Sequence, residues 1–363
     1  MSCPDIRDDD IEAVVAVLRS GTLSLGPCAE QFEKAFAAYV GSAEAVAVSS
    51  GTSGLHMAVR AAGLGQEDEV LTSAFSFVAS ANCILYERAK PVFVDVDEES
   101  MTIDPRLAAA AAGPRTRGIL PVHVFGQPCD MAPLIDLARQ RDLVLIEDAC
   151  EAIGAEYRGR RVGTFGAAAV FSFYPNKQMT TGEGAIVTTD DPAIASLLRS
   201  LRNQGRDAMG TWLSHERLGY NYRMSELSAA LGAVQLGRID EMLEMRRKVA
   251  EIYAERLAGV PGVRFLRPAP WTTRLSWFAA IARLDEGIDR DAVLERLAAA
   301  GIPARAYFAP LHLQPLYRRL LGHKEGDLPI TERLGRSTLA LPFHNHMDED
   351  AVGAVCDALC RAL

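Results

Sequence analysis

The chain has 363 residues, of which 49% are hydrophobic, and its formal net charge at neutral pH is -9. This length predicts roughly two domains of about 150 residues each. The acidic balance argues against a general nucleic-acid binder, and no run of about 20 apolar residues exists to span a membrane. The first 15 residues lack a basic region followed by an apolar one, so we expect no secretory signal and a cytoplasmic protein.

From about residue 45, short apolar runs alternate with patterns of helical spacing. Runs typical of buried strands lie at 45–49, 69–73, 91–96, 118–124, 143–148, 168–173 and 184–189. Helical patterns lie between most of them, for example at 52–63 and 131–142. Continuous apolar strands that alternate with helices indicate an α/β fold with a mostly parallel sheet covered on both faces.

The last third of the chain has a different pattern. A long helical pattern at 225–258 comes first, followed by only a few strand-like runs at 276–284, 302–308 and 337–342. Further helical patterns lie at 290–300 and 348–362. We therefore expect a large domain over residues 1–240 and a smaller α+β domain over residues 241–363. Ligands of an open α/β sheet bind beyond the carboxyl ends of its strands, so chemistry is expected in the residues that follow the strands.

The first candidate segment follows the strand-like run at 45–49. Residues 50–54, SGTSG, open a helical pattern with small residues, which leave backbone N–H groups free to bind an anion. The hydroxyls of Thr52 and Ser53 add donors. A phosphate cradle fits this pattern, and an ordinary capped turn is the alternative. The segment matches neither the Walker loop nor G-x-G-x-x-G, which disfavours ATP and NAD.

The second candidate is Asp148, at the end of the run 143–148. A carboxylate there could cap a helix, bind a metal or pair with a cation. No histidine lies near it in the sequence and no second acidic strand end matches it, so metal binding is the weaker interpretation. A cationic ring nitrogen would suit this carboxylate.

The third candidate is a lysine, a residue type that the chain uses only five times, at Lys34, Lys90, Lys177, Lys248 and Lys324. Lys177 follows the apolar run 168–173, whereas the other four lie in helical, turn or loop patterns. A lysine at the mouth of a buried sheet can attack a carbonyl and form a Schiff base. The alternative is a side chain that merely extends into solvent.

One cofactor uses a phosphate cradle, a carboxylate and a nucleophilic amine together. Pyridoxal phosphate carries a phosphate, a ring nitrogen and an aldehyde that these three groups would bind. Phe77, after the run 69–73, could stack on the ring, although an isolated aromatic residue is more often part of a core. The sequence therefore predicts a pyridoxal-phosphate site and no metal site.

Longer motifs carry a resemblance to a known family over nearly the whole chain. They include VSSGTSGLHMA, PVHVFGQPCDM, IEDACEAIGA, FSFYPNKQMTTGEGA and LGYNYRMSELSAAL. In combination they resemble the DegT/DnrJ/StrS aminotransferases, a branch of the fold type I pyridoxal-phosphate enzymes. The resemblance implies the aspartate-aminotransferase-like fold, with a mostly parallel seven-stranded sheet in the large domain. A mild departure is Ala185, where the family commonly has a second glycine.

The resemblance also implies a role for each matching residue. Lys177 would hold the cofactor as a Schiff base and then shuttle a proton, and Asp148 would pair with the ring nitrogen. Further cofactor contacts would come from Thr52, Ser53, Phe77, Glu151, Ser172 and Asn221. Asn221, in GYNYRM, matches an asparagine that reaches the phosphate of the neighbouring subunit, so the resemblance implies a homodimer with shared active sites.

The function that the resemblance implies is transamination. An amino-acid donor, glutamate by family resemblance, would supply an amino group to a nucleotide-linked keto sugar and so make an amino-deoxy sugar. Lys177 favours this over dehydration, because relatives that act as dehydrases carry histidine instead. A cyclitol or carbocyclic ketone of antibiotic biosynthesis is an alternative substrate, and a regulatory protein that binds the cofactor without turnover is an alternative function. Substrate contacts, each with a structural role as its alternative, are expected from Tyr307, His312, Arg223 and Trp212.

Overall fold

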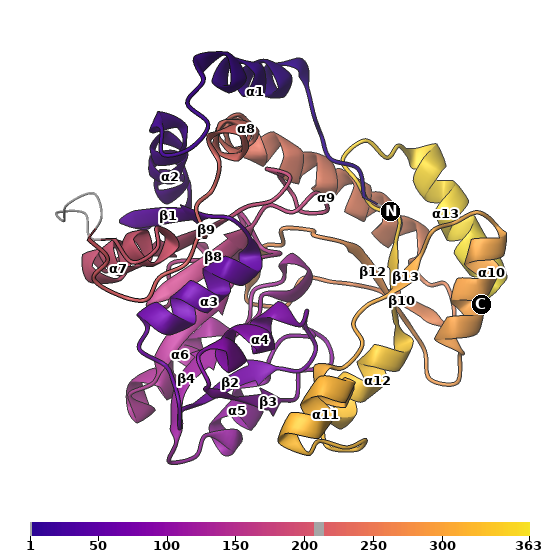
Figure 1. Cartoon of the computed structure of the whole chain (residues 1–363). Coiled ribbons are helices and arrows are strands. Elements are labelled where there is room, and N and C mark those ends of the chain that lie inside the picture. The colour runs from indigo at the N-terminus through magenta and orange to yellow at the C-terminus, as the bar shows by residue number, and fades with distance from the viewer. Residues whose placement is uncertain (1, 207–213) are drawn as a thin grey trace.

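The computed structural model describes residues 2–206 and 214–363, and a seven-stranded sheet is its largest element (Figure 1). The strands lie in the spatial order β1-β9-β8-β5-β4-β2-β3. They are β1 (Glu44–Val48), β2 (Glu69–Ser73), β3 (Lys90–Val94), β4 (Thr116–Leu120), β5 (Val144–Asp148), β8 (Ala168–Ser172) and β9 (Ala185–Thr189). Each of the seven runs predicted from the sequence corresponds to one of these strands.

One strand of this sheet is antiparallel to the other six. β2 pairs in parallel with β3 and β4, and β5 pairs in parallel with β4 and β8. β9 is antiparallel to both of its neighbours, β8 and β1. The sheet is therefore mostly parallel, as predicted, and the residues that follow β1, β2, β5 and β8 gather at one edge.

Helices cover both faces of the large sheet. They are α2 (Pro27–Val40), α3 (Gly51–Ala61), α4 (Ala79–Tyr86), α5 (Pro105–Ala111), α6 (Met131–Arg141) and α7 (Pro192–Arg202). Neighbouring residues of a strand point to opposite faces. Val170 accordingly packs in the core under α3, α4 and α7, whereas Phe171 packs in the core under α2. On the second face, α5 packs beside β3, and α6 packs beside β4 and β5.

The helical pattern at 225–258 forms two helices rather than one. α8 (Glu226–Gly237) and α9 (Ile239–Arg256) meet at Arg238, whose backbone leaves the helical region. Gly237 ends α8, and glycine is among the poorest helix formers. The Arg238 side chain pairs with Asp10 of α1 (Asp8–Ser20), which packs on α8 away from the large sheet (Figure 1).

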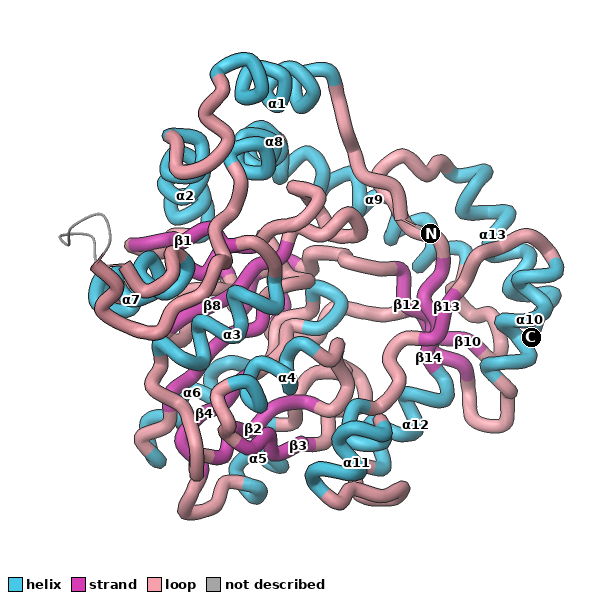
Figure 2. Tube along the Cα trace, viewed as in Figure 1, coloured by secondary structure: helices cyan, strands magenta, loops and turns pink. Residues whose placement is uncertain are grey.

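A second sheet of four strands lies beyond α9 (Figure 2). Its order is β10-β12-β14-β13, with β10 (Val263–Phe265), β12 (Ala280–Leu284), β13 (Arg305–Ala306) and β14 (Thr338–Leu341). The helices of this part of the chain are α10 (Arg290–Ala299), α11 (Pro315–Leu321), α12 (Pro329–Ser337) and α13 (Glu349–Ala362), with a short 3-10 turn, η2 (Leu311–Leu313). The α+β character that the sequence predicted for this part is therefore present.

A third, small sheet joins the two parts of the chain. β11 (Thr272–Arg274) pairs with β6 (Glu156–Tyr157), which pairs with β7 (Arg160–Arg161). The domain boundary at residue 240 stays a prediction, but this pairing means that residues 272–274 pack with the large domain. Within the two described ranges, no helix has both the length and the apolar character needed to cross a membrane.

Candidate active site

A cavity of about 470 Å³ lies at the edge where the parallel strands end. Four strands bring polar groups to it, because β1, β2, β5 and β8 all terminate there. Six of the eight cofactor contacts expected from the sequence line this cavity, namely Thr52, Phe77, Asp148, Glu151, Ser172 and Lys177. Ser53 and Asn221 do not.

Lys177 lies in the turn after β8, where its backbone N–H donates to the carbonyl of Tyr174 at 2.9 Å. Its side chain is 13% exposed, compared with 51% for Lys90 and 77% for Lys34. Nζ is 3.4 Å from Oε1 of Glu151 and 4.2 Å from the centroid of the Phe278 ring. The amine is therefore largely withdrawn from solvent and faces the cavity.

Asp148 is a buried carboxylate at the last position of β5, only 4% exposed. Oδ2 accepts a hydrogen bond from the Ser80 hydroxyl at 2.6 Å, and Oδ1 accepts one from the Cys150 N–H at 3.1 Å. In the described part of the chain no lysine, arginine or histidine forms an ion pair with it. Because a buried carboxylate is costly without a cation, a positively charged ring nitrogen in the cavity fits this site.

Two neighbours of Asp148 also line the cavity. Burial raises the pKa of the Glu151 carboxyl, and the charge of Lys177 opposes this shift. Oε2 of Glu151 accepts a hydrogen bond from the Phe125 N–H at 2.9 Å. Burial, together with the charge of Asp148, raises the pKa of the Cys150 thiol well above its ordinary value. The thiol therefore stays protonated, which does not suit a nucleophile.

The start of α3 also lines the cavity. The amides of Gly51 and Thr52 have no intrahelical partner, because they belong to the first turn. A Cβ placed on Gly51 would lie 3.0 Å from both Cβ and Oγ of Ser172. Glycine therefore lets the Ser172 side chain approach the helix start closely, and these groups together would suit a phosphate.

Ser53 differs from the expectation drawn from the family. Its hydroxyl donates to the Ser50 carbonyl at 2.8 Å and accepts from the Ser50 N–H at 2.9 Å. The Ser50 hydroxyl in turn accepts from the Ser53 N–H at 3.1 Å, so the two residues form a capping box for α3. The Ser53 side chain thus holds the helix start in shape and does not reach the cavity.

The expected substrate contacts have different positions. Tyr307 lines the cavity. His312 does not: its side chain is 0% exposed, and its Nε2 lies 3.0 Å from Glu332. Arg223 is also away from the cavity, where it donates to Asn203 at 2.9 Å. Trp212 lies outside the described residues.

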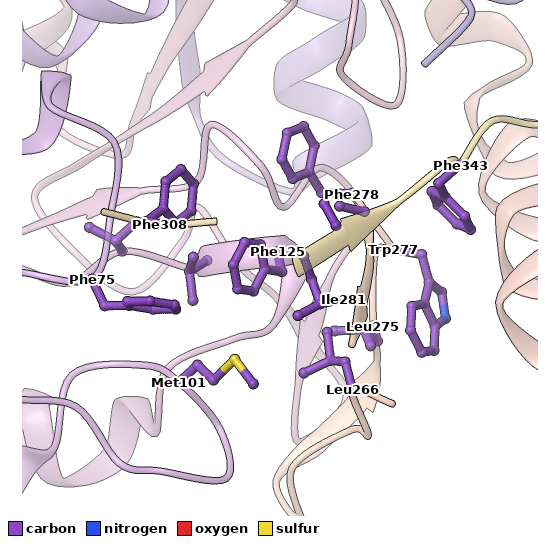
Figure 3. Close-up of a cluster of buried hydrophobic side chains, with 14 of the residues drawn as sticks. Phe75, Met101, Phe125, Leu266, Leu275, Trp277, Phe278, Ile281, Phe308 and Phe343 are labelled. Carbon is purple, nitrogen blue, oxygen red and sulfur yellow. The ribbon is translucent and has the colours of Figure 1, made fainter. Parts of the chain in front are cut away.

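The sequence interpretation missed one whole wall of the cavity. Phe278, Tyr307 and Phe308 reach it from the second half of the chain, and of these only Tyr307 was singled out. Phe278 and Phe308 lie with Phe75 and Phe125 in a group of aromatic side chains (Figure 3). Nothing in the sequence marks these residues. Ser80 carried a weak signal, because it lies three residues after Phe77 and so on the same side of a helical turn.

A second chamber of about 210 Å³ adjoins the first. The two share Tyr174, Asn176, Phe278 and Tyr307 as lining residues. Arg305 supplies the one charged side chain in the lining of the second chamber, and it is exposed there. Within the described ranges no carboxylate forms an ion pair with this guanidinium, so the chamber presents a positive charge that a ligand could meet.

Solved structures share this fold. The crystal structure of DesV from S. venezuelae, in complex with a ketimine intermediate, superimposes with a TM-score of 0.91. It is 38% identical in sequence, and the match covers 97% of this chain and 93% of that one. The fold and the cavity therefore define a fold type I aminotransferase.

The model of the DegT/DnrJ/EryC1/StrS aminotransferase family matches residues 4–360, and the chain belongs to this family. Its relatives include the GDP-perosamine synthase of Caulobacter vibrioides, 41% identical over 94% of this chain and 91% of that protein. Another is the dTDP-3-amino-3,4,6-trideoxy-alpha-D-glucose transaminase of Streptomyces venezuelae, 38% identical over 98% of this chain and 92% of that protein. The resemblance found in the sequence motifs is thereby confirmed.

Proposed function

We propose that this aminotransferase binds pyridoxal phosphate in the 470 Å³ cavity and moves an amino group from glutamate to a nucleotide-linked keto sugar. The observation that carries the proposal is the pair of buried groups facing that cavity, the amine of Lys177 and the carboxylate of Asp148. The Asp148 carboxylate accepts two hydrogen bonds and has no cationic partner among the described residues, which suits a protonated ring nitrogen.

Each lining residue has a distinct task in this proposal. When bound, pyridoxal phosphate supplies an aldehyde that takes up the amino group and a ring that accepts the electron pair of a broken C–H bond. Asp148 would keep the proton on the ring nitrogen. Lys177, once its amine is free, would take the proton from the donor carbon. It would then return this proton to the carbon of the cofactor that carries the amino group. The amides of Gly51 and Thr52, with the Ser172 hydroxyl, would bind the phosphate.

The second chamber supports a substrate with negative charge. The names of two relatives specify a GDP-linked and a dTDP-linked sugar. In this chain Arg305 lies in a chamber that shares four lining residues with the catalytic cavity, so its guanidinium could bind the diphosphate while the sugar reaches Lys177. A neutral cyclitol has no anionic group that could pair with this guanidinium.

The experiment that tests the function has two stages. Cofactor-loaded enzyme is mixed with glutamate, and formation of one equivalent of keto acid per site is measured. The aminated form is then given a panel of nucleotide-linked keto sugars and carbocyclic ketones, and the products are identified by mass spectrometry. Transfer to a nucleotide-linked sugar supports the proposal. Keto acid without any aminated sugar would favour the carbocyclic alternative, and no keto acid at all would favour a binding protein without turnover.

We also infer that the active enzyme is a homodimer with shared sites. Asn221 is exposed, pairs with Asn203 in an isolated bridge, and does not line the cavity of its own chain. Leu218 is 74% exposed and Tyr86 is 51% exposed, and both border a pocket on the surface formed by α3, α4 and the segment before Asn221. Exposed apolar side chains grouped in this way suit burial against a second copy.

A mixing experiment tests the shared site directly. The variant Lys177→Ala lacks the amine, and the variant Asn221→Ala lacks the group expected to reach the other subunit. In a mixed dimer one of the two sites would carry Lys177 from one chain and Asn221 from the other. Mixing the two purified variants should therefore restore activity that neither has alone. If each site is built from a single chain, the mixture stays as inactive as its components. A cytoplasmic location remains a prediction, which cell fractionation would test.

A further inference from the structure

The amine of Lys177 has both a carboxylate and the face of an aromatic ring as close neighbours. Nζ is 4.2 Å from the centroid of the Phe278 ring and 3.4 Å from Oε1 of Glu151. The negative face of an aromatic ring attracts a cation, and the attraction is stronger where water is excluded. Phe278 is 5% exposed. The ring therefore offers a favourable environment for a positive charge on this nitrogen.

Phe125 ties these two neighbours of the amine together. Its N–H donates to Oε2 of Glu151 at 2.9 Å, and its carbonyl accepts from the Phe278 N–H at 3.2 Å. Phe125 adopts the left-handed conformation, with φ of 59°. A residue with a side chain adopts this conformation at a cost. The contacts therefore form a closed loop, which runs from Lys177 to Glu151, Phe125 and Phe278 and back to Lys177.

A buried arginine holds the backbone of Phe278 in place. Arg246, on α9, is 2% exposed. Its Nη2 donates to the Phe278 carbonyl at 2.7 Å, its Nε donates to the Trp277 carbonyl at 2.8 Å, and its Nη1 donates to Asn345 at 3.0 Å. A guanidinium is costly to bury, and these three bonds compensate its lost hydration. Figure 3 shows Phe278, Trp277 and Phe125 in one cluster of buried side chains.

We propose that Phe278 is a positioning residue for the reaction, whose ring holds the Lys177 nitrogen while that nitrogen carries the transferred proton. The proposal rests on the proposed function. In that reaction the C–H bond of the donor would break, the cofactor, when bound, would supply the acceptor for its electron pair, and Lys177 would take the proton through a new N–H bond and become positively charged. The Phe278 ring is already in place when this charge develops, so it stabilises the charge without reorganisation.

Two variants of Phe278 distinguish the effect of the aromatic face from the effect of side-chain size. Phe278→Leu keeps an apolar side chain but removes the aromatic face, and Phe278→Tyr keeps the face and serves as the matched control. The measurement is the single-turnover rate of the cofactor-loaded enzyme with saturating glutamate. We expect Phe278→Leu to be slower by about 3- to 30-fold, which is the range that a cation–π contact converts to. The KM for glutamate should not change, and Phe278→Tyr should react at close to the wild-type rate.

A binding measurement excludes simple damage to the cavity. Pyridoxamine phosphate has no aldehyde and forms no bond with Lys177, so its affinity for the cofactor-free protein, read by tryptophan fluorescence, should be the same in all three proteins. The proposal is overturned if Phe278→Leu reacts as fast as wild type, if Phe278→Tyr is equally slow, or if the affinity for pyridoxamine phosphate falls by the same factor as the rate. Failure of the proposed function looks different, because the wild type itself would then make no keto acid.

Discussion

The cavity has two walls, and they are built in different ways. The wall that would hold the cofactor consists of residues that follow β1, β2, β5 and β8, and the paired strands place Asp148 and Ser172 on neighbouring strands. The other wall consists of Phe278, Tyr307 and Phe308, which come from loops and from the edge of the small sheet. The ends of regular strands thus bring together the proposed cofactor contacts, whereas irregular segments supply the aromatic side of the cavity.

The cofactor wall and the adjoining second chamber also differ in how their polar groups are satisfied. Asp148 and Glu151 are buried and each accepts hydrogen bonds from neighbouring groups. Arg305, in contrast, is exposed and has no acidic partner in the described part of the chain. Groups that must act on every substrate are thus held by the protein, whereas Arg305 is available for a ligand. Changes at Lys177 and Asp148 should therefore affect turnover, and a change at Arg305 should affect substrate binding.

The largest effect is expected from Lys177→Ala in the cofactor wall. Loss of the amine removes both the covalent attachment and the proton carrier, so turnover should fall by about 10³-fold or more. The absorbance of the lysine-bound cofactor should disappear as well. Lys90→Ala is the matched control, because Lys90 is exposed and paired with Glu69 on the surface. Retention of both turnover and absorbance in Lys177→Ala would contradict the assignment of the whole wall.

A smaller loss is expected from Asp148→Asn. The amide has nearly the same shape but no charge, so it cannot stabilise a protonated ring nitrogen. Turnover at saturating cofactor should fall by about 10²-fold, as for loss of one preorganised electrostatic contact. Thermal unfolding of the variant should confirm that it folds. If the folded Asp148→Asn variant keeps wild-type turnover, Asp148 has no part in the mechanism.

A change in the second chamber should separate the two halves of the reaction. Arg305→Gln removes the positive charge of the second chamber, so the KM for the nucleotide-linked sugar should rise by about tenfold, as for loss of a charge-assisted hydrogen bond. The half-reaction with glutamate should keep its wild-type rate. If both half-reactions slow equally, Arg305 does not bind the nucleotide part of the substrate.

The smallest effect is expected from Tyr307→Phe. Loss of one neutral hydrogen bond to the sugar should lower kcat/KM by about two- to tenfold. Burial, together with the nearby Glu151, raises the pKa of the Tyr307 phenol above its ordinary value, so the phenol stays protonated throughout the neutral and mildly alkaline range. The ratio of wild-type to variant kcat/KM should therefore be constant from pH 7 to about 9. A ratio that falls as pH rises would show that the phenol ionises there.

The large sheet and most of the cofactor wall could be predicted from residue patterns alone. Apolar runs of five or six residues have few structural alternatives, and parallel pairing brings their carboxyl ends to one edge. Asp148 and Lys177 could therefore be selected without knowing any contact. The break between α8 and α9 was missed because a continuous helical pattern conceals it, although Gly237 marks its place.

The second wall and the roles of individual polar residues became known only from the folded chain. His312 and Tyr307 lie five residues apart, yet one is buried against Glu332 and the other lines the cavity. Ser53 and Thr52 are adjacent, yet one caps α3 and the other faces the cavity. Phe278 lies on Lys177 with its backbone bonded to Arg246, on a separate helix, and to Phe125. Such placements depend on contacts between residues far apart in the chain, which no local pattern of residue types records.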